Sequence, residues 1–227
     1  MPRRSPPSSG RTASSRKCRA FVDFESPTGL STASFEGRID AVVVGASAGG
    51  VEALGTLLPA LPREFRPTVL VVIHQPRERR SLLADIFSAR CALPVQEAQD
   101  KEPAQPGTIY FAPPDYHLLV DDGPSLALSA DEPVLFSRPS IDVLFESAAD
   151  TYGHRLAGLI LTGANSDGAR GLAAVRQAGG VTLVQRPDTA LAASMPTAAL
   201  ARGPADFVLS LEQMARLLRM MGGGHEG

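Results

Sequence analysis

The sequence predicts a three-layer α/β domain, doubly wound, with a mostly parallel sheet, an antiparallel hairpin or edge, and helices on both faces. Two observations predict this fold class. Short, continuously apolar runs of strand length are typical of strands buried on both faces. They alternate with amphipathic stretches of helix length through most of the chain. The 227 residues, 44% hydrophobic and 20% charged, are enough for one domain of ordinary size.

The chain divides into a long central region and two short tails. Residues 1–38 are rich in Ser, Pro and Arg and poor in large apolar side chains, so we expect a disordered tail there. Residues 39–221 contain the predicted domain. Residues 222–227 read GGGHEG, which predicts a second flexible tail.

Composition excludes several classes of protein. The net charge of −2 gives no strong field that would favour nucleic acid or an anionic membrane. No apolar run approaches the roughly 18–20 residues of a membrane span. The two cysteines, Cys18 and Cys91, lack the spacing of a metal site, so we expect a cytoplasmic protein without a metal.

The first half of the predicted domain contains two strand–helix units. The run Ile39–Ser47 is apolar up to a glycine-rich turn and predicts a buried strand. Apolar residues at helical spacing follow it and stop at Pro62, which predicts a helix. The segment PTVLVVIH predicts a second buried strand that ends at His74. An amphipathic helix around Leu83 and Phe87 comes next.

The second half begins with a different pattern. The segment GTIYFAPPDYHLLVDDGPSLALS reads as two extended runs around a turn at Asp121–Pro124, which predicts a hairpin. RPSIDVLFESAADTYG predicts a helix, with Ser140 as a candidate cap. RLAGLILTG predicts a third buried strand, after which Asp167 and Gly168 open a helix. The strand VTLVQ, a helix near Ala198, the strand DFVLS and the helix LEQMARLLRMM complete the chain.

Three polar residues are expected at one edge of this sheet. In open α/β sheets the functional site lies outside the carboxyl ends of the strands. Ser47 and His74 each follow a predicted strand directly, and Asp167 lies a few residues beyond a third one. The sequence therefore predicts that these residues, far apart in the chain, come together.

Ser47 lies in the turn GASAGG, where its hydroxyl would stand exposed as a nucleophile. The N–H groups and positive end of the following helix could stabilise an oxyanion. The turn also resembles a dinucleotide fingerprint loosely, so the loop alone leaves both interpretations open. A dinucleotide fold wants an acidic residue at the end of the second strand. This strand ends in His74, which is the base that a serine nucleophile needs.

The remaining candidates also have two interpretations. His74 is either a buried structural histidine or a base. His117, inside the predicted hairpin, is the rival base, for which we expect a structural or site-wall role. Spacing alone favours Asp167 as a helix cap, but it can also orient a histidine, and the two roles are compatible. His154 and His225 lie in polar stretches and are expected to be solvated.

With these residues in view, the sequence resembles the catalytic domain of the CheB-type protein-glutamate methylesterases, from about Asp40 to Leu217. The matching blocks, in the family's order, are VVVGASAGGVEAL, VLVVIHQP, PGTIYFAPPDYHLLV, RPSIDVLFESAA, LILTGANSDGARGL and GGVTLVQ followed by MPTAA. The resemblance implies a serine esterase with Ser47 as nucleophile, His74 as base and Asp167 as orienting acid. It also implies hydrolysis of glutamate methyl esters on chemoreceptors, with glutamine deamidation as a further activity.

The resemblance implies further features of the site. No metal or organic cofactor is expected. The backbone N–H groups of Ala48 and Ala164 are the expected oxyanion donors. The family often has Thr and Met at these two positions, so the side-chain lining and the substrate preference are expected to differ here, whereas a backbone donor survives either change.

The expected partner is a methylated chemoreceptor or receptor-like signalling protein, with a separate regulator as a further partner. We expect no nucleic acid and no direct membrane insertion. Chemotaxis methylesterases of the well-known type carry an amino-terminal phosphoreceiver domain. Residues 1–38 fall short of the minimum of about 50 residues for a domain, so a stand-alone catalytic domain is expected. The alternatives are a non-catalytic signalling adaptor of the same fold and a nucleotide-binding α/β protein.

Overall fold

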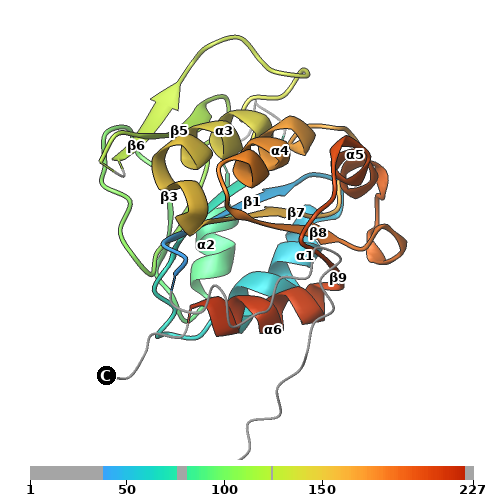
Figure 1. Ribbon diagram of the computed structural model, residues 1–227. Coiled ribbons are helices and arrows are strands. Elements are labelled where there is room, and N and C mark those ends of the chain that lie inside the picture. Colours follow the sequence, from blue (N-terminus) through green and yellow to red (C-terminus); the bar gives the residue numbers. More distant parts are fainter. Residues whose placement is uncertain (1–37, 76–80, 124, 223–227) are drawn as a thin grey trace, which may run out of the picture.

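The computed structural model describes residues 38–75, 81–123 and 125–222. Its centre is a seven-stranded sheet with the strand order β3-β4-β2-β1-β7-β8-β9, in which every neighbouring pair is parallel (Figure 1). The strands are β1 (Ala41–Ala46), β2 (Thr68–Ile73), β3 (Val95–Glu97), β4 (Ile109–Phe111), β7 (Leu156–Ile160), β8 (Val181–Gln185) and β9 (Phe207–Leu209).

Two further strands form an antiparallel hairpin outside the main sheet, β5 (His117–Asp121) and β6 (Ser125–Ser129). The α-helices are α1 (Gly50–Leu57), α2 (Leu83–Ser88), α3 (Ile141–Tyr152), α4 (Ala169–Gln177), α5 (Ser194–Arg202) and α6 (Leu211–Met221). Single 3₁₀ turns cover Leu58–Ala60, Gly153–Arg155 and Pro187–Thr189. Among the residues that the structure describes, no helix is both long and apolar enough to cross a bilayer.

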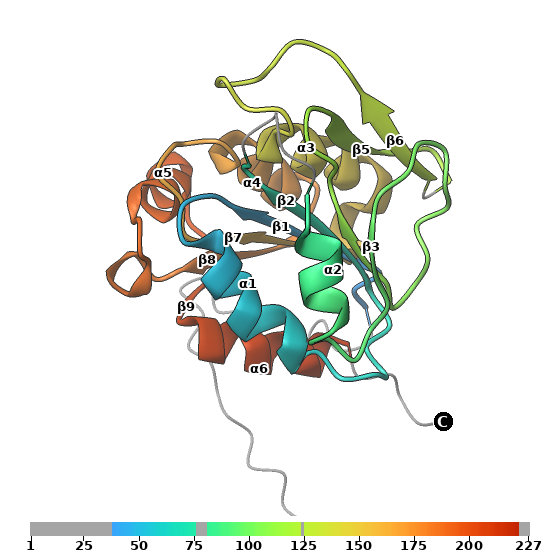
Figure 2. The ribbon, with the colours of Figure 1, turned by 180° about the vertical axis from the view of Figure 1, so that it is seen from behind.

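Both faces of the sheet are covered by helices, which confirms the predicted fold class. Helices α1, α2 and α6 pack on one face (Figure 2), and α3, α4 and α5 on the other. All six residues of β1 are buried, and so are all six of β2. Burial on both faces is why these strands are continuously apolar in the sequence and do not alternate.

The structure corrects three details of the predicted elements. Ile109–Phe111 pairs with β2 in the main sheet, so it is not an arm of the hairpin. The strand β3 was not predicted, because an edge strand of the sequence VQE has no apolar run. Helix α1 ends at Leu57, and a 3₁₀ turn fills the space before Pro62. Residues 1–37 and 223–227, which cover nearly all of both expected tails, lie outside the described residues.

The strand order explains how the candidate residues meet. Strands β2, β1 and β7 are neighbours, with Ala46 opposite Ile73 and Gly45 opposite Ile160. From β1 the chain continues to β2 on one side, whereas β7 and β8 extend the sheet on the other side. The ends of β1 and β7 therefore form a topological switch point, where α/β sheets commonly bind their ligands.

Candidate active site

Backbone hydrogen bonds on both sides fix Ser47 at the end of β1. Its N–H donates to the carbonyl of Thr162 in the loop after β7 (2.9 Å), and its carbonyl accepts from the N–H of Gly50 (2.8 Å). Gly49 has a φ of 77°, a left-handed conformation that glycine adopts without steric cost. A Cβ at Gly49 would also lie 2.8 Å from the Leu191 side chain. The chain thus passes from β1 into α1 within one tight turn.

A cleft of about 360 Å³ lies beside Ser47. Its lining residues come from the ends of β1 and β2, from the loop before α3 and from the loop after β7. They are Ser47, His74, Gln75, Phe136, Ser137, Arg138, Pro139 and Asn165. Two of the sequence-predicted residues, Ser47 and His74, therefore share one cleft.

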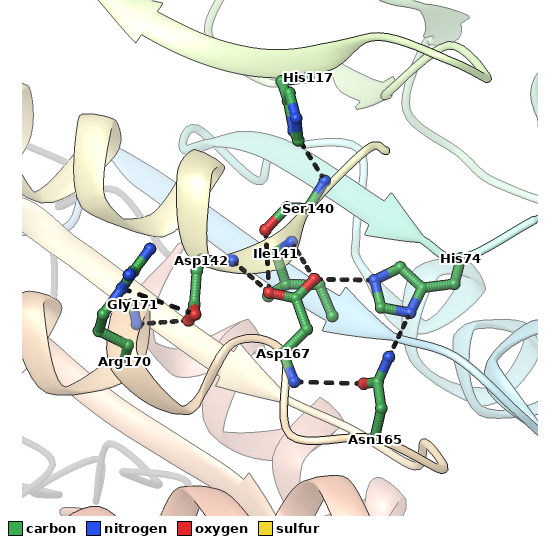
Figure 3. A network of polar contacts seen from close by, with 9 residues as sticks. All are labelled: His74, His117, Ser140, Ile141, Asp142, Asn165, Asp167, Arg170 and Gly171. Carbon is green, nitrogen blue, oxygen red and sulfur yellow. Dashed lines mark hydrogen bonds and ion pairs between the residues drawn. The ribbon is translucent and has the colours of Figure 1, made fainter. Parts of the chain in front are cut away.

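Asp167 lies behind His74 and is fully buried. His74 Nε2 lies 2.8 Å from Asp167 Oδ2, although the two residues are 93 positions apart (Figure 3). A carboxylate can only accept, so Nε2 carries the ring proton and Nδ1 of the neutral ring keeps its lone pair. This tautomer follows from the hydrogen-bond partners. The arrangement leaves Nδ1 as the nitrogen that can accept a proton.

The amino terminus of α3 holds the Asp167 carboxylate. Oδ1 accepts from the Ser140 hydroxyl (2.9 Å) and from the N–H of Asp142 (3.0 Å). Oδ2 accepts from the N–H of Ile141 (2.7 Å), next to the contact with His74. These N–H groups belong to the first turn of the helix, which has no partners of its own for them and carries positive dipole charge.

This contact corrects the cap expected from spacing. The N-cap position of α4 belongs to Gly168, at a φ of 93°, and no side chain caps that helix. Asp167 lies one residue too early and caps α3 instead, across 25–27 residues of sequence. Ser140 occupies the N-cap position of α3, but its side chain accepts no hydrogen bond from that helix.

The surroundings of Asp167 lower its pKa below the ordinary value of an aspartate. Burial is the largest single influence and would raise the pKa by itself. The hydrogen bonds from His74 and from the N–H groups of Asp142 and Ile141 together outweigh it. A carboxylate beside His74 is therefore stable in its charged form, which is the form that stabilises an imidazolium.

His117 supports this network from behind. It is buried, with its Nδ1 accepting from the Ser140 N–H (3.1 Å) and its Nε2 donating to the Glu132 carbonyl (3.2 Å). Both ring nitrogens are thus used inside the fold, and the residue is not part of the lining of the cleft. This geometry fits the structural role expected for His117. His154 is exposed, and His225 lies outside the described residues.

Asn165 is a site residue that the sequence did not single out. Its Nδ2 donates to His74 Nδ1 (3.2 Å), and its Oδ1 accepts from the Asp167 N–H (3.2 Å) (Figure 3). One amide side chain therefore touches both members of the His–Asp pair. The only signal in the sequence is that Asn165 stands two residues before Asp167, and this spacing alone does not indicate a contact with His74.

Ala48 and Ala164 are exposed and lie on two loops that are fastened together. The Thr162 hydroxyl donates to the Ala48 carbonyl (2.8 Å), and the Thr162 N–H donates to Gln185 Oε1 (2.9 Å). Within the described part of the chain, neither the Ala48 N–H nor the Ala164 N–H donates to a protein acceptor. Thr162, which the sequence analysis did not single out, thus joins the two loops that carry the N–H groups of Ala48 and Ala164.

Arg138 holds the wall of the cleft formed by residues 136–139. Its guanidinium donates to Asp115 Oδ1 (2.7 and 3.1 Å) and to the carbonyls of Ala130 (2.6 Å) and Asp131 (2.9 Å). Only 17% of the Arg138 side chain is exposed. A single arginine therefore ties the loop before α3 to the segment before β5.

Several known proteins resemble this chain in sequence or in structure. The family model for CheB methylesterase matches residues 42–218. A relative from Leptospira interrogans is 45% identical over 178 residues, which cover 78% of this chain and 92% of that protein. A relative from Rhizobium johnstonii, named protein-glutamate methylesterase/protein-glutamine glutaminase 2, is 38% identical over 88% of this chain but only 55% of its own length.

The chain thus spans about half the length of the Rhizobium protein and nearly all of the Leptospira one. Among solved structures, the CheB methylesterase catalytic domain of Thermotoga maritima matches with a TM-score of 0.76 and 31% identity. The match covers 80% of this chain and 97% of that domain. The fold and the sequence lead to the same conclusion: the chain belongs to the CheB methylesterase family.

Proposed function

We propose that this chain hydrolyses the methyl esters of glutamate side chains on a chemoreceptor-like protein, with Ser47, His74 and Asp167 as its catalytic triad. The observation that carries the proposal is the His74–Asp167 pair, joined at 2.8 Å, in contact with the cleft that Ser47 lines. The names of the relatives support the reaction, and they favour neither an adaptor nor a nucleotide-binding protein.

In the first half of the reaction, Ser47 Oγ attacks the ester carbonyl carbon. His74 Nδ1 accepts the serine proton, and the Asp167 carboxylate stabilises the resulting imidazolium. The carbonyl oxygen becomes an oxyanion, for which the N–H groups of Ala48 and Ala164 are the proposed donors. When the tetrahedral intermediate collapses, the C–O bond to the methoxy group breaks. The proton on His74 passes to the leaving oxygen, and methanol departs.

In the second half, water hydrolyses the acyl-enzyme. His74 Nδ1 takes a proton from the water while its oxygen attacks the carbonyl carbon, and the same two N–H groups hold the oxyanion again. The bond to Ser47 Oγ breaks, the serine recovers its proton from His74, and the glutamic acid side chain that is released gives its remaining proton to solvent. The same sequence of steps deamidates glutamine, with ammonia in place of methanol, as the relatives' names indicate for those proteins.

The proposed substrate is a methylated receptor or a receptor-like signalling protein, reached in the cytoplasm, with a separate regulator as a further partner. The cleft is open at its rim, where Phe136 is 98% exposed, so an ester on the surface of a folded protein can enter. The methyl ester of a glutamate side chain on a helix surface is such a group.

Methanol release from a methylated receptor tests the proposal. Wild type is expected to release methanol, whereas Ser47→Ala is expected to lose several orders of magnitude in rate while it stays folded. Ser88→Ala is the matched control, because Ser88 is exposed on α2 and bonds only to the Asp85 carbonyl among the contacts described. Near-normal turnover by a folded Ser47→Ala protein would refute the triad.

A further inference from the structure

The proton-accepting nitrogen of His74 is occupied in this structure. Because Nε2 donates to Asp167, Nδ1 holds the only lone pair of the ring. Asn165 Nδ2 donates to that lone pair at 3.2 Å. The Ser47 hydroxyl, by contrast, makes no hydrogen bond with the residues described here. An amide, and not the serine, therefore occupies the acceptor that the serine needs.

The orientation of the Asn165 amide is determined by its other contact. The Asp167 N–H can only donate, so the oxygen of the amide must face it, at 3.2 Å. The NH₂ group then faces His74. Protonated imidazole has an N–H at Nδ1 and could not accept this bond, so the contact exists only with the neutral ring.

We propose that Asn165 is a positioning residue that acts through His74. In the resting protein its amide holds the neutral tautomer with Nδ1 free of a proton. It must then leave Nδ1 before Ser47 or water can transfer a proton there, because one lone pair cannot accept from two donors at full strength. This proposal rests on the proposed function. It adds a residue whose side chain prepares the base by holding the neutral tautomer, and opposes it by occupying the nitrogen that must accept the proton.

Two substitutions separate the contact with His74 from the contact with Asp167. In Asn165→Ser the shorter hydroxyl can still accept from the N–H two residues ahead, as in an ST turn, but it is too short to reach the imidazole. In Asn165→Asp an oxygen still faces Asp167 N–H, but the donor to His74 becomes an acceptor. Both variants thus keep the turn that places Asp167.

The test is the rate at which a fluorophosphonate, a serine-directed probe, labels the full chain between about pH 5 and pH 8. At the alkaline end Asn165→Ser is expected to react about two to ten times faster than wild type, which is the effect of losing one competing hydrogen bond. The acid limb of its pH–rate profile, where labelling slows as the pH falls, is expected to move to higher pH. The reason is that the neutral ring has lost a hydrogen-bond donor. Asn165→Asp is expected to move the limb further, because a carboxylate favours the protonated ring.

A purely structural asparagine would change the melting temperature without moving the limb. Labelling of Asn165→Ser at or below the wild-type rate overturns the proposal, and so does an unchanged acid limb in Asn165→Asp. Failure of the proposed function looks different: wild type and Ser47→Ala would then be labelled equally, whatever residue stands at position 165.

Discussion

At the scale of single residues, Asp167 serves two purposes with one carboxylate. It accepts from His74 and from three groups at the start of α3, so four donors surround two oxygens. Orientation of a base and capping of a helix are usually separate tasks. Here the helix that needs a negative charge at its amino terminus supplies the hydrogen bonds that keep the carboxylate charged.

Asp167→Asn tests both purposes at once. Both carboxylate oxygens of Asp167 accept hydrogen bonds, whereas an asparagine side chain has only one oxygen. Its NH₂ group must therefore face two of the four donors, which it cannot accept from. We expect ester hydrolysis to fall about 10⁴-fold, as it does for the corresponding substitution in a serine protease. The free energy of unfolding should fall by about 1–3 kcal/mol, the cost of one unsatisfied buried contact. Methanol release and urea denaturation measure the two effects.

The exposed hairpin residue Asp121, paired only loosely with Lys101 at 3.8 Å, offers a matched Asp121→Asn control. This variant should match wild type in both measurements, because exposed ion pairs contribute little. An Asp167→Asn protein that lost stability but kept its specific activity would show that the residue is only a cap for α3.

At the scale of elements, the sequence predicted the helices and strands whose caps and apolar runs lie within the element itself. The helix α6 spans the predicted residues because Ser210 and Gln213 form a capping box that is readable in the sequence. The apolar runs of β1, β2 and β7 are equally direct. The contact of Asp167 with α3 is not readable, because it depends on how α3 and the loop before α4 pack. The role of Asn165 depends on the same packing.

The packing of α3 against α4 can be tested at Gly171. A Cβ there would lie 2.5 Å from Phe145 Cβ and 3.0 Å from the Asp142 backbone, and the Gly171 N–H donates to Asp142 Oδ1 (2.7 Å). Gly171→Ala should therefore lower the unfolding free energy by about 1–3 kcal/mol, the usual cost of overpacking. It should also reduce activity, because α3 carries the donors to Asp167.

Gly203→Ala is the matched control, since no atom lies within 4 Å of a Cβ at that position. Its melting temperature and activity are expected to stay close to those of wild type. Equal melting temperatures for the two alanine variants would mean that α3 and α4 can separate without cost.

At the scale of the whole molecule, two buried carboxylates make opposite contributions to stability as the pH changes. The pKa of Asp167 is lowered, so its contribution is present above the unfolded value of about 3.9 and is lost as the pH falls through the lower folded pKa. The pKa of Asp142 is raised, first of all by burial. Its contribution is present below about 3.9 and is lost as the pH rises through the folded pKa.

These signs predict how the protein responds to acid. The proposed base must be neutral to accept a proton, so methanol release should fall as the pH drops from about 7 to 5. Asp167 stays ionised over that range, because its pKa lies below the ordinary value of an aspartate. The loss of activity should therefore be reversible on return to neutral pH, with an unchanged far-ultraviolet circular dichroism spectrum.

The variant Asp142→Asn tests whether the acid sensitivity of the activity comes from Asp142 or from His74. The amide oxygen can still accept from the Gly171 N–H, and the raised-pKa carboxyl is gone. An acid limb at the wild-type position would assign the limb to a group other than Asp142, as the proposed role of His74 requires. A limb that disappeared in Asp142→Asn, or an activity loss that accompanied loss of the circular dichroism signal, would instead trace the acid sensitivity to the junction of α3 and α4.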